Sequence, residues 1–433
     1  MRAIDRMWGQ MGGVLLALAV PITAFAQPAT GGPAPPATHV SLDDAVRLAV
    51  VHNHALRAQR LNTDLAKADE VTAALKPNPV FTSTNENFPV FAPTDLFSWN
   101  NLTTNQNFVE SFSYLFERGN KRRIRTTVAR DTTGLTINAT ADAERQLAFQ
   151  TAQAFIGVLL AQSTLDLAKE NLANFTDVLE VNRARLRAGD LAEADFLKIS
   201  LQKLQFEQDL ASAQVGLSLA KTTLRQNVGF DGLAADFQVD GTLQRTPTST
   251  TLDALLRAAL GARPDLLAAH NGVQLAADTE ALAYSNRVRD LTAGVEYDRA
   301  GSLNAVGFTV SIDLQVHDRN QGNIAHAKVG KLQASEVEAA VQTTVRAEVE
   351  SAWVTLQSSA QVVQLFESGY LDQAKESLAI ARYVYQQGNG PLLDLLDAER
   401  TSRSTELAYR QALASYMTSV QQVNFAVGKQ VLP

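Results

Sequence analysis

Two carboxylates three residues apart, Asp394 and Asp397, have the clearest potential for chemistry in this sequence. Residues three apart lie on one face of a helix, so a helix at this position would present both carboxylates together. Carboxylates that face a passage attract cations and repel anions. A solvated acidic helix face has the same spacing, so the two residues alone do not distinguish a functional pair from a plain surface.

The rest of the sequence contains no motif typical of an enzyme. It has no phosphate-binding glycine loop, no GxSxG and no HExxH. It has no cysteine, and its 6 histidines do not cluster; His52 and His54 would meet a metal together only in an extended backbone. The 38 basic residues against 45 acidic ones form no clustered basic footprint. We therefore expect no enzyme, no cofactor, no metal site and no nucleic-acid partner.

The positions around the carboxylates belong to an internal duplication. Residues 41–76 align without a gap with residues 251–286 at an offset of 210, and a second block aligns at an offset of 199. In that second block Asp195 is the counterpart of Asp394, and Gly189 is the counterpart of Gly388. Each half therefore begins and ends alike, and a duplication of this length determines the architecture of the chain.

Proline spacing predicts very long helices in both halves. No proline occurs between residues 93 and 247 or between residues 264 and 391, so long helices can form there. The stretches 118–187 and 318–387 would each run about 105 Å as one helix at 1.5 Å per residue. Glycine-containing breaks at 187–190 and 386–391 then predict hairpin tips, followed by returning helices over 191–228 and 390–428.

Between the helices the period of the hydrophobic pattern changes from that of a helix to that of a strand. Apolar and polar residues alternate strictly over 306–316, and we expect strands near 80–88, 108–117, 291–298 and 305–316. Strands of about ten residues with one apolar and one polar face suit a transmembrane barrel, and an ordinary half-buried hairpin is the alternative. Because four strands cannot close a barrel, several copies would have to share one.

The two ends of the duplication define the expected domains. Arg2 and Arg6, a short apolar stretch and Ala24-Phe25-Ala26 predict a signal peptide over 1–26, followed by a flexible leader over 27–40. We expect a first repeat over 41–230, a linker over 231–250 and a second repeat over 251–430. Because cysteine is absent, we expect an exported protein without a lipidated N-terminal cysteine.

The ordered set of these features resembles the TolC family of outer-membrane efflux channels over residues 41–430. The resemblance is carried by LDDAVRLAVVHNHAL and LDALLRAALGARPDL at the repeat openings, LKPNPVFTSTNENF before the first strand, FERGNKRRI and HDRNQGNIAHA after the strand pairs, and QQGNGPLLDLLDAERTSRSTELAYRQAL after the second tip. PNP before the strand and GNKR after it look most like the heavy-metal efflux branch of the family.

The resemblance implies a mainly α fold with a small transmembrane β part. In it, long α-helical hairpins from a homotrimer form a tunnel continuous with a 12-stranded β-barrel that has four strands from each chain. It further implies a passive duct in the outer membrane, in contact with its lipid, that works with a periplasmic adaptor and an inner-membrane efflux pump. Heavy-metal cations are the favoured cargo, and drugs or other small molecules are the alternative. A soluble coiled-coil scaffold is a more distant possibility. A general porin is a third, and circular dichroism would separate it because porins are nearly all strand.

The same resemblance assigns roles to two groups of residues, and the position of the second strand suggests a role for a third. Asp394 and Asp397 would line the periplasmic constriction, and Asp195 would add to the same entrance. The tips where an adaptor would dock are Gly189, Asp190, Gly388, Asn389 and Gly390. A basic cluster just past the second strand would lie at the inner-leaflet headgroups if that strand descends, and it consists of Lys121, Arg122, Arg123 and Arg125.

Overall fold

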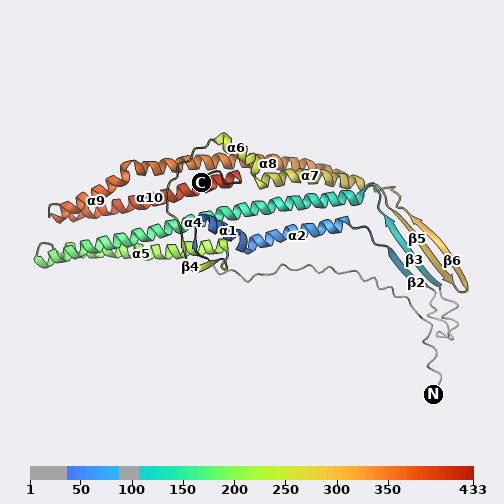
Figure 1. Ribbon diagram of the computed structural model, residues 1–433, viewed down its shortest axis with the longest axis horizontal. Helices are drawn as coiled ribbons and strands as arrows, with labels where there is room; N and C mark the ends of the chain where they lie inside the picture. The colour runs from blue at the N-terminus through green and yellow to red at the C-terminus, as the bar shows by residue number, and fades with distance from the viewer. Residues whose placement is uncertain (1–36, 87–106) are drawn as a thin grey trace, which may run out of the picture. The chain divides into compact units, whose positions relative to one another are not determined.

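Long helices and a four-stranded sheet make up the described part of the protein, residues 37–86 and 107–433 of a computed structural model (Figure 1). The helices are α1 (Leu42–His52), α2 (His54–Ala74), α4 (Lys121–Ala188), α5 (Glu193–Val228), α6 (Leu252–Ala262), α7 (Pro264–Ser285), α8 (Gln321–Leu365), the π-helical turn η1 (Phe366–Tyr370), α9 (Leu371–Gln386) and α10 (Leu392–Val427). The strands are β1 (Ala37–Val40), β2 (Val80–Glu86), β3 (Asn107–Phe116), β4 (Leu233–Val239), β5 (Leu291–Ala300) and β6 (Leu303–Ser311). The mainly α fold predicted from the sequence is confirmed.

The two halves make matching contacts at their helix breaks. In the first half, Asn53 lies between α1 and α2, and its side chain donates to the Asn227 carbonyl at the end of α5, at 2.8 Å. In the second half, Arg263 separates α6 from α7 and donates to the Ala426 carbonyl at the end of α10, at 3.1 Å. Because helix ends leave their last carbonyls unsatisfied, each break residue completes the end of the returning helix of its own half.

The long helix of the first half is continuous, whereas that of the second half is not. α4 runs without interruption, and the residues that flank it, Asn120 and Gly189, both have a positive φ. The second helix, expected over 318–387, is instead divided into α8 and α9 by η1, in which Gly369 has φ 125°. The sequence prediction was wrong here because it relied on proline spacing, and a glycine adopts this conformation without the steric penalty of a Cβ.

The four-stranded sheet has the order β2-β3-β5-β6, with all neighbours antiparallel. β6 ends at Ser311, which pairs with Thr292, whereas the alternation of the sequence predicted a strand to residue 316. β5 begins at Leu291, so the residues after Ser311 have no strand beside them with which to form a ladder. Residues 87 and 88 of the first expected strand lie outside the described ranges.

Two further strands correct the predicted leader and linker. β1, at the end of the expected leader, pairs in parallel with β4, which lies in the expected linker. Val40 of β1 and Leu233 and Phe237 of β4 are completely buried against α4 and α5. Burial of these apolar side chains, rather than the proline- and glycine-rich composition, determines the conformation of residues 37–40.

Two apolar clusters form the main core, one in each half. The first joins α1, α4, α5 and β4, and the second joins α6, α8 and α10. Leu243 of the linker and Met417 of α10 pack against both clusters and thereby connect the halves. No helix in the described ranges is both long enough and apolar enough to cross a membrane.

Charged groups also cross between the halves. Arg145 of α4 lies 4.0 Å from Asp265 of α7 and donates to the Phe425 carbonyl at 2.6 Å. Arg263 is completely buried and pairs with Asp265 and with Glu348 of α8. Burial alone would raise the pKa of Asp265, but the hydrogen bonds and charges of Arg263 and Arg145 hold that pKa below its ordinary value.

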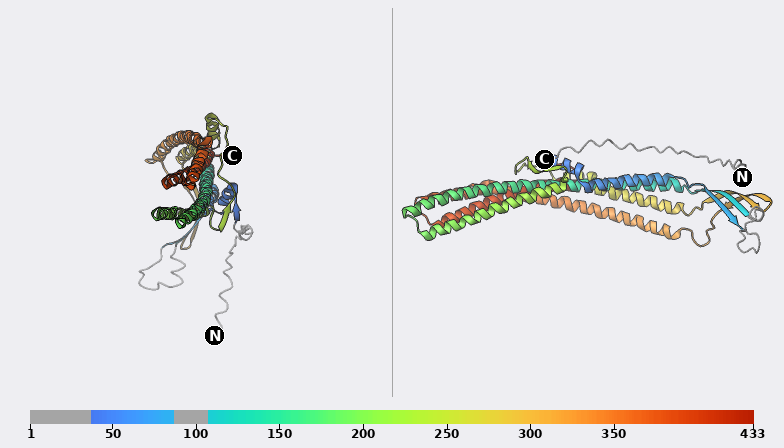
Figure 2. Two further views of the ribbon diagram at one scale, coloured as in Figure 1. Left: turned by 90° about the vertical axis from the view of Figure 1, so that its left-hand side faces the viewer. Right: turned by 90° about the horizontal axis from the view of Figure 1, so that it is seen from below.

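The two hairpin tips lie side by side at the end of the helices opposite the sheet, as the views in Figures 1 and 2 agree. The first tip joins α4 to α5, and the second joins α9 to α10. The groups to which the sequence gives roles are thus divided between these tips and the junction of helices and sheet.

Candidate functional site

The predicted tip glycines occupy positions that require their backbone freedom. Gly189 has φ 85° and Gly388 has φ 74°. In each tip the glycine and the residue after it donate to carbonyls of the preceding helix, which is a common way to end a helix. Gly390 packs closely, because an added Cβ would lie 2.9 Å from Cγ1 of Val384. Gly189, Asp190, Gly388 and Asn389 are exposed, so a partner can reach them.

A buried contact that the sequence did not reveal connects the two tips. The Tyr385 hydroxyl of α9 donates to Oδ1 of Asn182 of α4 at 2.6 Å. Arg185 of α4 donates to the Tyr385 carbonyl at 3.3 Å, and its guanidinium lies 5.4 Å from the centre of the Tyr385 ring. Burial raises the pKa of the Tyr385 hydroxyl; the Arg185 charge opposes this rise, and the Asp195 charge adds to it.

Asp394 and Asp397 lie together, as their spacing predicts, on the first turns of α10. Both carboxylates are exposed and line a cavity of about 590 Å³ between α9 and α10. Glu376 of α9 lines the same cavity, so the structure adds a third carboxylate that sequence spacing could not associate with the other two. Asp195 is on the other hairpin, where it pairs with Lys198 of its own helix at 3.0 Å.

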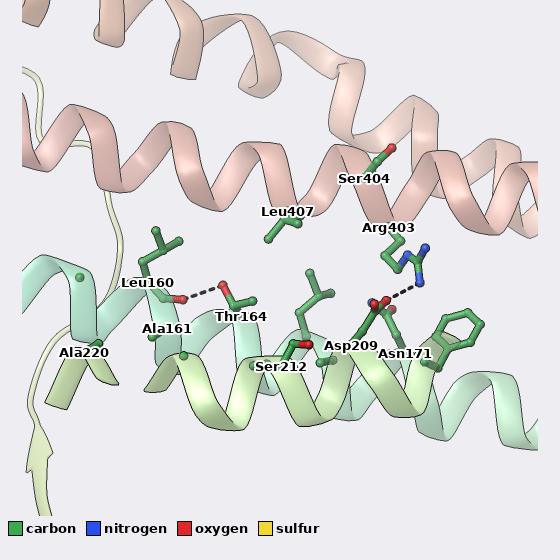
Figure 3. A pocket seen from close by; sticks show the side chains of 16 residues that line it. Leu160, Ala161, Thr164, Asn171, Asp209, Ser212, Ala220, Arg403, Ser404 and Leu407 are labelled. Atoms are coloured by element: carbon green, nitrogen blue, oxygen red, sulfur yellow. Dashed lines mark hydrogen bonds and ion pairs between the residues drawn. The ribbon is translucent and has the colours of Figure 1, made fainter. Parts of the chain in front are cut away.

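Further along the helices from the tips, a second polar contact connects the two hairpins. Arg403 of α10 pairs with Asp209 of α5 at 2.6 Å, and its guanidinium lies 5.0 Å from the centre of the Phe206 ring. Figure 3 shows this pair beside a cavity of about 650 Å³ between α4, α5 and α10. Small residues, including Gly157, Ala161 and Gly216, line the cavity and leave it open.

The predicted basic cluster at the start of α4 divides into two kinds of residue. Lys121 pairs with Asp290 at 2.8 Å, and Arg125 pairs with Glu117 at 2.7 Å. Burial would raise the pKa of Asp290, but the hydrogen bonds from Lys121 and from the backbone hold that pKa below its ordinary value. Arg122 and Arg123 are exposed. Only these two of the four predicted cations therefore point into open space.

The register of the sheet sorts its side chains onto two faces. One face is apolar and carries Phe81, Phe112, Val295 and Phe308, which are cross-strand neighbours and largely exposed. The opposite face is mainly polar, with Thr, Ser and Gly residues along all four strands. Exposed aromatic and aliphatic side chains on one face and polar ones on the other are typical of a strand between lipid and water.

Charge is distributed unevenly between these faces. The charged residues on the polar face of the described strands are Glu86, Glu296 and Asp298, all of them acidic. On the apolar face Glu110 accepts a hydrogen bond from the Ser83 hydroxyl at 2.9 Å. The alternation in the sequence predicted the two faces, but the cross-strand register was needed to place all three polar-face carboxylates on the same one.

Metal-ligating side chains do not gather in the described ranges. Among residues 37–86 and 107–433, no three His, Cys, Asp or Glu side chains lie close enough together to hold a metal ion. His54 lies 3.8 Å from Asp231, and both side chains are largely exposed.

Replacing Tyr385 by Phe should loosen the contact between the tips. The substitution removes the hydroxyl and leaves Oδ1 of Asn182 buried without its donor, which costs about 1 kcal/mol. We expect backbone amides of α9 near the tip to exchange hydrogen about fivefold faster, measured by mass spectrometry. Tyr383→Phe is the matched control, because Tyr383 is 64% exposed on the same helix. Equal exchange in the two variants would contradict a role for this hydrogen bond.

Comparisons with known proteins agree with this geometry. Residues 255–429 match the family model described as outer membrane efflux protein. The chain is 24% identical to the cobalt-zinc-cadmium resistance protein CzcC of Cupriavidus metallidurans over 96% of its own length and 98% of that protein. It is 24% identical to the outer membrane protein TolC of Vibrio cholerae over 66% of its own length and 68% of that protein.

A solved structure of CusC has the same fold, with a TM-score of 0.74 at 19% identity over 90% of this chain and 92% of that one. Family match, full-length relative and fold lead to one conclusion. Residues 255–429 belong to the outer membrane efflux protein family, whose members are passive channels and not enzymes, and the chain as a whole resembles these channels in sequence and fold.

Proposed function

We propose that this protein is the outer-membrane duct of a tripartite efflux system and that its favoured cargo is heavy-metal cations. The observation that carries the proposal is the division of the sheet into an apolar face and a polar face that bears only acidic charges. Lipid suits the first face, and a water-filled passage for cations suits the second.

The edges of the sheet support assembly from three copies. Among residues 37–86 and 107–433, β2 pairs only with β3, and β6 pairs only with β5. Each edge strand therefore has unpaired backbone groups on its outer side, and such edges are not tolerated in lipid. Three copies would contribute twelve strands, enough to enclose a lumen, whereas two would give a small barrel filled by side chains.

The helical end of the molecule supports docking in the periplasm. In a trimer the hairpins would surround a tunnel that continues the barrel, and the exposed tips would face a periplasmic adaptor and an inner-membrane pump. Gly189, Asp190, Gly388, Asn389 and Gly390 are the residues that we assign to adaptor contact. Residues 1–26 would direct export, and without cysteine the mature chain would not be lipidated at its N-terminus.

The acidic groups along the proposed passage favour cations as cargo. Asp394 and Asp397 would form rings of carboxylates at the periplasmic entrance, with Asp195 near the same end. Glu296 and Asp298 would form further rings within the barrel. The relative CzcC is named for cobalt-zinc-cadmium resistance. TolC of Vibrio cholerae is named only as an outer membrane protein, and its name gives no cargo. Drugs or other small molecules are the alternative cargo.

Replacing both Asp394 and Asp397 by Ala should weaken cation preference at the entrance. At about 4 Å in water two unit charges interact by about 1 kcal/mol, which corresponds to a roughly fivefold difference in local cation occupancy. We expect higher single-channel conductance in planar bilayers and a smaller cation-to-anion permeability ratio. Asp69→Ala with Glu336→Ala is the control, because both residues are exposed helix carboxylates away from the tips. Unchanged conductance and selectivity would remove the entrance proposal.

The polar-face carboxylates allow a separate test inside the barrel. Glu296→Gln with Asp298→Asn should lower the cation-to-anion permeability ratio, because their charges would face the lumen. Glu110→Gln is the matched control, since Glu110 pairs with Tyr297 on the same strands but lies on the opposite face. A larger effect from Glu110→Gln than from the double variant would reverse the assignment of the faces.

Deletion of the gene in its host decides the cargo. We expect the strain to become several-fold more sensitive to cobalt, zinc or cadmium salts and to regain tolerance with the wild-type gene. The same panel should include hydrophobic drugs. Sensitivity to drugs alone would overturn the metal assignment and support the small-molecule alternative.

A further inference from the structure

We propose that the junction between sheet and helices binds anionic phospholipid headgroups through a ring of exposed cations from both halves. We call this ring the junction collar, and it consists of Lys76, Arg118, Arg122, Arg123, Arg287 and Arg319. The inference rests on the proposed function, because the collar meets lipid only if the sheet lies in a membrane.

Each connection between a helix and a strand contributes to the junction collar. Lys76 lies between α2 and β2, and Arg118 lies between β3 and α4. Arg287 lies between α7 and β5, and Arg319 lies between β6 and α8. Arg122 and Arg123 follow on the first turn of α4, and all six side chains are on exposed residues. A cation thus stands on each of the four segments that connect a helix with the four-stranded sheet.

Contacts between the connections bring the halves of the collar together. The Arg118 backbone amide donates to Asp290 at 2.9 Å, and the Ser285 hydroxyl donates to the Gly119 carbonyl at 2.6 Å. Gly119 fits here because glycine has no Cβ; a Cβ added at this position would lie 2.8 Å from Cβ of Val288. The segment after β3 is therefore held directly against the segment before β5.

The remaining two connections are held in the same way. Arg289 donates to the Asp318 carbonyl at 2.5 Å, and Asn320 donates to the Ala283 carbonyl at 2.6 Å. These bonds attach the segment after β6 to the segment before β5. Arg125 donates to the Leu75 carbonyl at 3.2 Å and so attaches the segment before β2 to the start of α4. The collar cations are thus arranged around one rigid base.

Acidic residues of the junction do not cancel the charge of the collar. Glu117 is paired with Arg125, and Asp290 is paired with Lys121. Asp318 is exposed, and its carboxylate accepts from the Asn320 amide at 2.8 Å. Asp313 is also exposed. After the internal pairs are set aside, six exposed cations face these two exposed acids.

The collar borders directly on exposed apolar side chains. Phe116 at the end of β3 is 49% exposed, and Leu314 and Val316, which follow β6, are 81% and 65% exposed. An apolar band next to a ring of Lys and Arg is the pattern of a membrane interface, with alkyl chains on one side and phosphates on the other. Free phosphate would satisfy the cations but not the apolar band, so we assign the collar to a lipid surface.

Lipid competition in purified protein tests this assignment. The full chain would be reconstituted in equimolar phosphatidylglycerol and phosphatidylcholine, and its retained lipids would be counted by native mass spectrometry. We expect wild-type protein to retain phosphatidylglycerol preferentially. Arg122→Gln, Arg123→Gln, Arg287→Gln and Arg319→Gln together should reduce this preference by at least about fivefold, the effect of a single cation near an anionic surface.

The control variant removes the same number of exposed charges elsewhere. Arg47→Gln, Lys67→Gln, Arg346→Gln and Lys429→Gln lie on exposed residues outside the collar and should leave the preference unchanged. A salt titration of the wild-type protein tests the inference even if the collar variant does not fold. Raising the ionic strength from about 0.01 M to about 1 M shortens the screening length from about 30 Å to about 3 Å and should abolish the preference.

Three outcomes would overturn the inference. One is a conducting wild-type channel without lipid preference, which would leave the proposed function intact. Another is an equal loss of preference in the collar and control variants. The third is displacement of phosphatidylglycerol by inorganic phosphate at the same concentration, which would indicate a simple anion site. A wild-type protein that neither inserts nor conducts would remove the proposed function together with this inference.

Discussion

One contact in each half, between the residue at the first helix break and the last turn of the returning helix, holds the architecture together. Asn53 donates to the Asn227 carbonyl, and Arg263 donates to the Ala426 carbonyl. A carbonyl left without a donor costs about 1–3 kcal/mol where it is buried, as beside Arg263, so each contact favours one placement of the short helices. The short helices are α5 and α2 in the first half and α10 and α7 in the second. Each pair lies end to end beside α4 or α8, so the strand pair and the hairpin tip are at opposite ends (Figure 1).

The elements that the sequence predicts correctly are those with long periodic signals. Proline spacing and glycine breaks predicted the helical hairpins, and alternation of apolar and polar residues predicted the strands of the sheet. The errors occur where a single residue or a tertiary contact decides. Gly369 interrupts the second long helix through one positive φ, and β1 exists because Val40 is buried against the first repeat. Neither fact is visible in composition or period.

The residues of the candidate site were likewise predicted only where a local sequence pattern places them. Helical spacing alone was enough to place Asp394 and Asp397 together. The contact of Tyr385 with Asn182 could not be predicted, because Tyr385 corresponds to Leu186 at the offset of 199 and the repeat therefore gives it no polar counterpart. The collar cations of the second half were missed because Arg287 and Arg319 lie apart in sequence and meet only through the packing of three connections.

The charges of the chain are sorted by the environment that each group meets. Buried charges such as Arg263 are paired, because an unpaired buried charge is costly. Exposed cations gather at the base of the sheet, whereas acids gather on its polar face and at the second tip. For a duct this separation matters, since solvated carboxylates attract cations by only about 1 kcal/mol each at contact distance in water. Attraction of that size raises the local concentration of a cation yet lets it leave, as passage requires.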